Sequence, residues 1–182
     1  MATPNKLKQN IILVGPMGSG KSTVARIIGE KLGWRVCDLD LLIMEKTGMT
    51  IPEIFAGKGE AYFRRVEKEL LATVLQEEHL VVATGGGAVL DEENRRVMKE
   101  NGTVVYLRTE IKELCRRVGK GEGRPLLAGG EPEEVLARLT REREAFYREA
   151  QVIVETRGLT PEAVAGQVIA AVFQGVAGGK DL

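Results

Sequence analysis

The sequence has little of the side-chain chemistry on which zinc enzymes and triad hydrolases depend. Its 182 residues include one histidine, His79, and two cysteines, Cys37 and Cys115. One histidine without matching partners supplies neither a zinc site nor a Ser-His-Asp triad, so both mechanisms are excluded. The two cysteines match no metal-ligand spacing, and we expect them to be buried thiols in a reducing cytosol.

The chain also lacks an excess of one charge and a long apolar run. Lysine plus arginine and aspartate plus glutamate number 26 each, so no global field attracts nucleic acid or an anionic membrane. Residues Met1 to Gln9 carry Lys6 and Lys8 but no apolar stretch of the kind that a signal peptide needs. We therefore expect a cytoplasmic monomer with no nucleic-acid or membrane partner, in which anion recognition is local.

The pattern of apolar residues predicts one α/β domain over the whole chain, with a core at about 10–174. Short apolar runs alternate with longer segments of helical period, which is typical of parallel strands joined by crossover helices. The expected strands are Ile11 to Val14, Arg35 to Cys37, Leu80 to Ala83, Thr103 to Leu107 and Val152 to Glu155. The expected helices are 21–32, 41–46, 60–78, 92–100, 111–118, 133–149 and 161–173.

Two glycine-containing segments, 47–59 and 119–132, interrupt this alternation. We interpret both as mobile insertions on one domain, which is where binding residues often lie. The glycine-rich tail from Gly175 to Leu182 is expected to fray.

A phosphate-binding loop is the strongest motif in the chain. The sequence from Gly15 to Ser22 matches G-x-x-x-x-G-K-[ST], follows an apolar strand and opens an amphipathic helix, which is the context that supports the match. Backbone N–H groups and the helix N-terminus would hold the phosphates of ATP, and Lys21 would reach the terminal ones. An accidental glycine-rich turn is the alternative. The expected nucleotide-binding residues of this segment are Met17, Gly18, Ser19, Gly20, Lys21, Ser22 and Thr23.

Two aspartates follow the second predicted strand, in Cys37-Asp38-Leu39-Asp40. In an extended segment, residues two apart point the same way, so both carboxylates would face the crevice beside the phosphate loop. Asp38, together with the hydroxyl of Ser22, would then serve one Mg²⁺ that accompanies ATP, and Asp40 would orient or deprotonate the attacking hydroxyl. The alternative is that Asp40 only caps a helix that begins at Leu41.

Two further segments are candidates for binding an acceptor. Arg64 and Glu67 are three residues apart on a predicted helix, where a pair would preset the guanidinium for a carboxylate. A solvated surface pair is the alternative. The glycines Gly85, Gly86 and Gly87 end a buried strand, and they suit either ligand contact with backbone or a flexible connector.

Arginines in the last third of the chain complete the candidate site. The stretch from Arg116 to Leu127 combines cations with glycines and predicts a lid that would bring Arg124 onto the phosphates, although a solvated basic loop has the same composition. Four arginines lie on the following predicted helix among glutamates, a pattern that mostly describes a solvated face. They are Arg138, Arg141, Arg143 and Arg148.

Taken together, these motifs resemble those of the shikimate kinase family, from about Ile11 to the last strand. The shared features are the phosphate loop, the Asp-x-Asp pair, a Phe-Arg-x-x-Glu segment, the glycine triplet, an Arg-Pro-Leu-Leu lid and an arginine followed by tyrosine four residues on. The resemblance implies a three-layer P-loop kinase fold similar to nucleoside monophosphate kinases, with strand order 2-3-1-4-5. It also implies a substrate-binding insertion at about 40–68 and a mobile lid at about 119–131.

The resemblance further implies ATP-dependent phosphorylation of the 3-hydroxyl of shikimate, in the pathway to chorismate and the aromatic amino acids. The implied catalytic residues are Lys21, Asp40 and Arg124, with Ser22 and Asp38 at Mg²⁺ and Arg117 beside adenine. The implied shikimate contacts are Asp40, Arg64, Gly86 and Arg143, with Gly85 and Gly87 shaping the turn. One departure is the segment Thr156 to Leu159, where relatives often place an arginine near adenine, and Arg157 is therefore not assigned.

Two other functions compete with this assignment. A gluconate kinase would have the same phosphate loop, but it is not expected to combine Phe-Arg-x-x-Glu with three glycines. A regulatory protein that has lost catalysis is the second, and the presence of Lys21, Asp38, Asp40 and Arg124 argues for activity.

Overall fold

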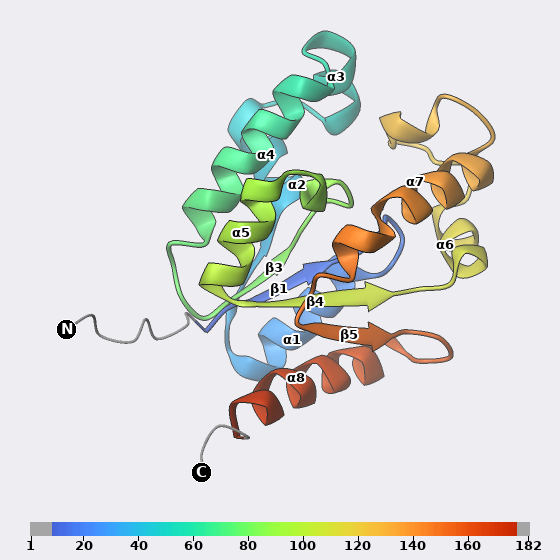
Figure 1. The fold of residues 1–182 in the computed structure, drawn as a ribbon. Coiled ribbons are helices and arrows are strands. Elements are labelled where there is room, and N and C mark those ends of the chain that lie inside the picture. The colour runs from blue at the N-terminus through green and yellow to red at the C-terminus, as the bar shows by residue number, and fades with distance from the viewer. Residues whose placement is uncertain (1–8, 178–182) are drawn as a thin grey trace.

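A parallel sheet of five strands forms the centre of the computed structural model, which describes residues 9–177 (Figure 1). The strand order is β2-β3-β1-β4-β5, and every neighbouring pair is parallel. The strands are β1 (Ile11–Val14), β2 (Arg35–Asp38), β3 (Leu80–Ala83), β4 (Thr103–Arg108) and β5 (Val152–Glu155). The predicted strands and their order are confirmed.

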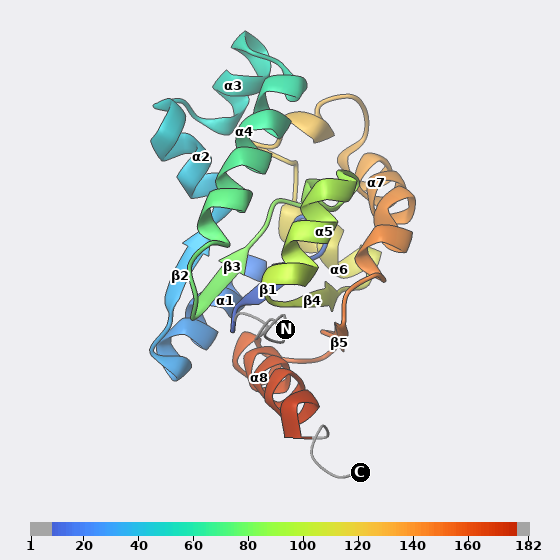
Figure 2. The same cartoon turned by 60° about the vertical axis from the view of Figure 1, so that its left-hand side comes forward.

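Helices cover both faces of the sheet and make three layers (Figure 2). One face packs against α1 (Lys21–Leu32) and α8 (Pro161–Ala177), and the other against α4 (Glu60–Val74), α5 (Glu92–Asn101) and α7 (Pro132–Tyr147). Side chains alternate between the two cores, so that Ile11 and Leu13 face α1 whereas Ile12 and Val14 face the opposite helices. This two-sided burial explains why β1 and β3 are apolar without interruption.

Two groups of helices extend from the carboxyl edge of the sheet. The first comprises α2 (Leu39–Thr47), α3 (Ile51–Gly57) and the first turns of α4, which share a small core of their own. The second comprises α6 (Ile111–Val118), the lid with its 3-10 turn η2 (Pro125–Leu127), and α7. Turn η2 contacts α3, so the two groups meet over this edge (Figure 2).

The helix predictions differ from the structure mainly in the region that precedes α4. Residues 51–57 form α3 inside a segment that was expected to be irregular. The signal is a capping box: the Thr50 hydroxyl accepts from Glu53 N at 3.3 Å, and Thr50 N donates to Glu53 Oε2 at 2.7 Å. Helix α2 begins at Leu39 rather than at residue 41, and α4 ends at Val74 rather than at residue 78.

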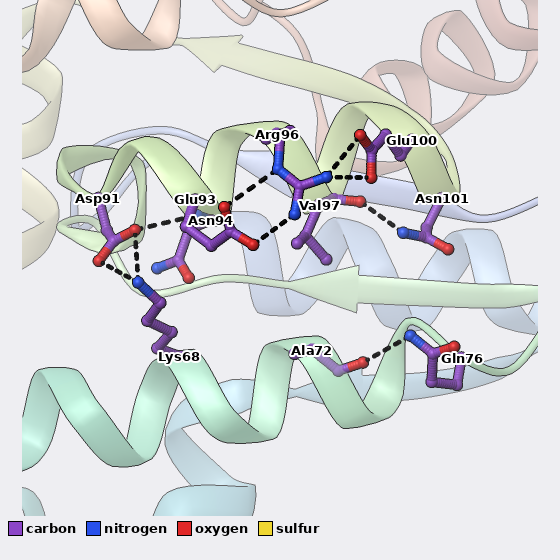
Figure 3. A network of polar contacts seen from close by, with 10 residues as sticks. All are labelled: Lys68, Ala72, Gln76, Asp91, Glu93, Asn94, Arg96, Val97, Glu100 and Asn101. Carbon is purple, nitrogen blue, oxygen red and sulfur yellow. Dashed lines mark hydrogen bonds and ion pairs between the residues drawn. The ribbon is translucent and has the colours of Figure 1, made fainter.

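An ionic network joins α5 to α4, the helix that carries Arg64 (Figure 3). The carboxylate of Asp91 caps α5 by accepting from Asn94 N at 3.2 Å, and it also accepts from Lys68 Nζ at 3.0 Å. On the outer face of α5, Arg96 pairs with both Glu93 and Glu100. The Lys68–Asp91 pair therefore links α4 to the start of α5 within one helix layer.

The ends of the chain bear on two expectations. The glycine-rich tail beyond residue 177 lies outside the described residues. Within residues 9–177, no helix is both long and apolar enough to cross a membrane.

Of the two cysteines, Cys37 is buried as expected, whereas Cys115 is partly exposed.

Candidate active site

The phosphate-binding loop has the predicted setting between buried β1 and α1. Gly15, Gly18 and Gly20 all have positive φ values, of 148°, 83° and 92°. At Gly15 a side chain is also excluded by packing, because an added Cβ would lie 2.9 Å from the carbonyl oxygen of Leu107. These glycines are therefore needed for the path of the loop, and the accidental-turn alternative is wrong.

Lys21 is the buried cation of this loop. Its Nζ donates to the carbonyl oxygens of Gly15 at 2.7 Å and Pro16 at 3.0 Å. Burial lowers the pKa of Lys21 from 10.5 to about 8, although the nearby Asp40 carboxylate acts in the opposite direction. An anion placed in the loop would favour the charged ammonium form.

Asp38 caps a helix and also binds the phosphate loop; the cap is the role that the sequence alternative gave to Asp40. Its Oδ1 accepts from Asp40 N at 3.0 Å and from Leu41 N at 3.3 Å, so Asp38 is the N-cap of α2. The alternative in which Asp40 is the cap is wrong, as is the extended conformation assumed for Asp40. The other oxygen of Asp38, Oδ2, accepts from Ser22 Oγ at 2.5 Å, which joins α2 to the phosphate loop.

Asp40 lies in the first turn of α2 and faces the crevice. Its Oδ1 is buried and has no hydrogen-bond partner within residues 9–177. Burial raises the pKa of this carboxyl, and the neighbouring Asp38 raises it further, whereas Lys21 and Arg124 oppose both effects. An unpaired buried carboxylate oxygen costs free energy, so this atom is suited to accept a hydrogen bond from a ligand.

Two cavities adjoin at the carboxyl edge of the sheet. One, of about 270 Å³, lies over the phosphate loop and reaches Asp38, and the other, of about 350 Å³, lies between α2, α3, the glycine triplet and the lid. Both are lined by the same five residues where they meet: Met17, Asp40, Gly85, Gly86 and Arg124. The two cavities therefore form one crevice with a shared wall.

Arg64 and Glu67 form a buried ion pair in the second cavity, not a surface pair. Arg64 Nη1 donates to Glu67 Oε1 at 2.8 Å, and the side chain of Glu67 is 0% exposed. Burial raises the pKa of Glu67, which the Arg64 guanidinium partly offsets. Arg64 Nε and Glu67 Oε2 are buried without hydrogen-bond partners in the described part of the chain. Glu60 Oε1 lies 3.5 Å from Arg64 Nε, so two carboxylates hold the guanidinium beside the cavity.

The three glycines after β3 pack closely against two charged side chains and the phosphate loop. An added Cβ at Gly87 would lie 2.3 Å from Arg64 Nη2, and one at Gly85 would lie 2.7 Å from Glu67 Oε2. At Gly86 the nearest atom would be Met17 N of the phosphate loop, at 3.3 Å. The alternative of a flexible connector is wrong, because the triplet packs against the phosphate loop and against the Arg64–Glu67 pair.

Arg143 differs from the other arginines of α7 in its burial. It is 5% exposed and lines the second cavity, whereas Arg138, Arg141 and Arg148 are exposed. One turn further along α7, the hydroxyl of buried Tyr147 donates to the carbonyl oxygen of Gly86 at 2.6 Å. The structure therefore separates Arg143 from its neighbours, as the family resemblance implied.

The lid places Arg124 on the shared wall of the crevice. Arg117 has a different position: its Nη1 donates to Gly18 O at 3.2 Å and its Nε pairs with Glu113 at 2.7 Å. Arg157 is exposed on the β5–α8 connection and pairs with Glu110. Among the predicted site residues, those lining the crevice are Met17, Gly18, Gly20, Lys21, Ser22, Thr23, Asp38, Asp40, Arg64, Gly85, Gly86, Gly87, Arg124 and Arg143, and those outside it are Ser19 and Arg117.

Sequence reasoning missed the apolar wall of the second cavity. This wall comes from α2, α3, α4 and the lid, and its residues look like ordinary core positions of amphipathic helices in the sequence. Thr84 in the first cavity and Glu122 in the second were also missed. The apolar residues are Met44, Ile51, Pro52, Phe55, Phe63, Pro125 and Leu126.

The first cavity offers oxygen atoms of the kind that Mg²⁺ prefers. Ser22 Oγ and Asp38 Oδ2 lie together there, and oxygen ligands from phosphate groups would have to complete the coordination of an ion. Within residues 9–177, no cluster of three or more His, Cys, Asp and Glu side chains could hold a metal ion. The residues therefore fit an ion that enters with a nucleotide.

Known proteins with similar sequences identify the family of this chain. The model of the shikimate kinase family matches residues 17–173. Shikimate kinases from Geobacter metallireducens and Nitrosococcus oceani are 43% and 46% identical over 168 and 164 residues, which cover 92% and 90% of this chain and 93% and 86% of theirs.

Solved structures agree with the sequence relatives. A shikimate kinase from Acinetobacter baumannii in complex with shikimate has a TM-score of 0.89 at 40% identity, covering 94% of this chain and 96% of its own. A deoxyadenosine kinase from M. mycoides has a TM-score of 0.62 at 19% identity, covers 91% of this chain and 100% of its own, and shares the fold alone. The fold is that of the P-loop kinases.

Proposed function

The chain belongs to the shikimate kinase family, and we propose that its crevice holds ATP over the phosphate loop and shikimate in the second cavity. The protein is an ATP-dependent kinase that acts on shikimate in the pathway to the aromatic amino acids. The assignment of individual residues rests on the geometry of the crevice. The observation that carries it is the shared wall, where the unpaired Oδ1 of Asp40 lies between a phosphate loop and a fixed guanidinium.

The nucleotide end of the crevice is formed by the loop and the start of α1. Backbone N–H groups from Met17 to Thr23 and the ammonium of Lys21 would contact the phosphates, with Arg117 towards the adenine. Ser22 and Asp38 would hold Mg²⁺ through oxygen atoms. When bound, the ion neutralises charge on the terminal phosphates.

The acceptor end of the crevice matches a small hydroxylated acid. Arg64 and Arg143 would bind the carboxylate of shikimate, Gly86 would contact the ring through its backbone, and the apolar wall would pack against the ring carbons. Asp40 would accept a hydrogen bond from the attacking hydroxyl, which we assign as the 3-hydroxyl, and take its proton as transfer proceeds. The products would be shikimate 3-phosphate and ADP.

The lid would complete the site by closing over the nucleotide. Arg124 lines both cavities, so its guanidinium can contact the transferring phosphoryl group where they meet. Closure would also exclude water, which competes with the hydroxyl as nucleophile. The glycines 119, 121 and 123 all have positive φ and are candidate hinges.

A substrate panel tests the proposed acceptor directly. Purified protein with ATP and Mg²⁺ is incubated with shikimate or gluconate, and ADP release is followed by a coupled assay. We expect ADP formation with shikimate at least 100-fold above that with gluconate, because gluconate lacks the ring that the apolar wall contacts. Equal rates with both acids would contradict the assignment of the second cavity, and no ADP with either would support the inactive regulatory alternative.

Arg64, Gly86 and Arg143 line the second cavity and form the proposed acceptor seat. Substitution of Gly87 tests the packing of this seat. We expect Gly87→Ala to raise the Kd for shikimate about 5- to 150-fold, the equivalent of about 1 to 3 kcal/mol, because its Cβ would displace the Arg64 guanidinium. Because the displaced guanidinium also pairs with buried Glu67, the melting temperature should fall as well. Gly166→Ala, whose Cβ meets no atom within 4 Å, is the matched control. An unchanged Kd in Gly87→Ala would show that Arg64 does not bind the substrate.

The pH dependence of ATP capture follows from Lys21. Its ammonium is charged below a pKa of about 8 and neutral above it, so kcat/KM for ATP should fall as the pH rises through about 8. In the complex, the phosphates favour the charged form, so the fall in kcat should begin at higher pH. Steady-state kinetics from pH 6 to 10 measure both profiles. A kcat/KM that stays constant to pH 10 would remove Lys21 from ATP binding.

We also propose that the enzyme is cytoplasmic, as its pattern of cysteine use suggests, and that it is a monomer. Sedimentation velocity measures the mass directly, and the chain mass is 19.9 kDa. A species of twice that mass at micromolar concentration would contradict the monomer.

A further inference from the structure

Two stacked tyrosines lie behind the glycine triplet, outside the crevice itself. Tyr106 in β4 and Tyr147 at the end of α7 have ring centroids 5.1 Å apart, and their side chains are among the most buried in the described chain. Their hydroxyls differ in what they bind. Tyr147 donates to Gly86 O at 2.6 Å, whereas Tyr106 donates to Glu144 Oε2, also at 2.6 Å, away from the crevice.

The Tyr147 hydroxyl also meets the buried arginine of the acceptor seat. Burial raises the pKa of Tyr147 to about 12, and the positive charge of Arg143 opposes this shift. The phenol therefore keeps its proton at working pH and donates it to Gly86 O at 2.6 Å. The Tyr147 hydroxyl thus binds the glycine turn and lies close to the Arg143 guanidinium.

Gly86 packs between the phosphate loop and Arg143. An added Cβ would lie 3.3 Å from Met17 N, 3.6 Å from Gly15 O and 3.6 Å from Arg143 Nη1. A shift of Gly86 by a fraction of an ångström would therefore change its contact with Arg143, whereas the phosphate loop is also held by the hydrogen bonds from Lys21 to Gly15 O and Pro16 O.

We propose that Tyr147 is a positioning residue of this kinase, whose hydroxyl holds the Gly86 carbonyl and the Arg143 guanidinium in the arrangement that binds the acid. This inference rests on the proposed acceptor seat. Tyr147 touches neither cavity and takes no part in proton or phosphoryl transfer. Its effect is on the acceptor side, because Lys21 and the rest of the loop have their own hydrogen bonds.

The neighbouring tyrosine provides a matched control for the test. Tyr147→Phe and Tyr106→Phe each remove one oxygen from a buried, stacked ring with a 2.6 Å hydrogen bond. We expect Tyr147→Phe to raise KM for shikimate at least fivefold, the effect of about one net hydrogen bond, with KM for ATP within twofold of wild type. Tyr106→Phe should leave both constants within twofold, with a comparable loss of melting temperature.

The outcomes separate positioning from simple stability. A rise below fivefold in KM for shikimate, an equal rise in KM for ATP, or the same rise in Tyr106→Phe would overturn the proposal. In the Arg143→Ala background, Tyr147→Phe should have less than a twofold further effect on shikimate binding, and full additivity would also overturn it. Wild-type protein that does not phosphorylate shikimate would instead refute the acceptor seat, which the substrate panel tests separately.

A measurement on folded wild-type protein does not depend on Tyr147→Phe being stable. The chain has three tyrosines, Tyr62, Tyr106 and Tyr147, so 3-fluorotyrosine labelling gives three ¹⁹F resonances. Single Tyr62→Phe and Tyr106→Phe proteins assign the signal of Tyr147 by elimination. Saturating shikimate should shift the Tyr147 resonance more than that of Tyr106, and an unshifted Tyr147 resonance would overturn the proposal.

Discussion

Asp40→Asn is expected to lower kcat about 10²- to 10⁴-fold while leaving the Kd for ATP within about twofold of wild type. Asparagine has the shape of aspartate, so α2 and its cap at Asp38 should persist. It cannot accept the proton of the attacking hydroxyl, and it removes the one carboxylate on the wall shared by both cavities. Burial already holds the pKa of Asp40 above its usual range, closer to that of a general base.

The measurement combines single-turnover kinetics with nucleotide titration at pH 7. That pH lies below the Lys21 pKa of about 8, which matters because Asp40 favours the charged form of Lys21 and its loss would lower that pKa. Glu45→Gln is the matched control, since Glu45 is an exposed carboxylate on the same helix. Turnover that is unchanged in Asp40→Asn would remove Asp40 from the role of base.

Arg143→Ala should weaken shikimate binding by about 2 to 5 kcal/mol, or roughly 30- to 5,000-fold, with the affinity for ATP nearly unchanged. The side chain is 5% exposed and lines the acceptor cavity, so its interaction with a carboxylate is poorly screened by solvent. Isothermal titration with shikimate measures the loss directly. Arg138→Ala on the same helix is the control, because Arg138 is exposed and has a single ion pair of 3.8 Å.

Substitution of Arg64 tests the binding of the substrate carboxylate less directly than substitution of Arg143 does. Arg64→Ala would leave Glu67 fully buried without its cation, and that change destabilises the fold as well as the seat. Arg64→Lys keeps the charge but loses the planar fork, so it should weaken shikimate binding with a smaller loss of stability. If Arg143→Ala changes only ATP affinity, the carboxylate of the substrate does not bind between these arginines.

The sequence predicted the sheet and the nucleotide end of the site well, for physical reasons. Strands buried on both faces, such as Ile11–Val14 and Leu80–Ala83, read as uninterrupted apolar runs. The phosphate loop is local, so its spacing alone predicts most of the residues that line the first cavity. Parallel strands also bring their carboxyl ends to one edge, which places Asp38 and the glycine triplet beside the loop.

The acceptor end could not be derived from local pattern. Nothing in the sequence around Arg143 distinguishes it from Arg138, because burial depends on how α7 packs over the sheet. The buried state of Glu67 also comes from tertiary packing, in a helix where surface pairs of the same spacing are common. For Arg143, the family resemblance singled out the residue that spacing did not. The role of Asp38 as the cap of α2 was missed because the helix starts two residues earlier than its apolar pattern suggests.

The lining residues that the two cavities share have a consequence for ligand design. Because Asp40, Gly86 and Arg124 border both spaces, an adenosine polyphosphate covalently tethered to a cyclic hydroxy acid could occupy them together. The tether would convert two bimolecular encounters into one, and the second moiety would bind at a high effective concentration. The length of the polyphosphate bridge should then set the avidity, with the optimum at the span between the loop and the arginine pair.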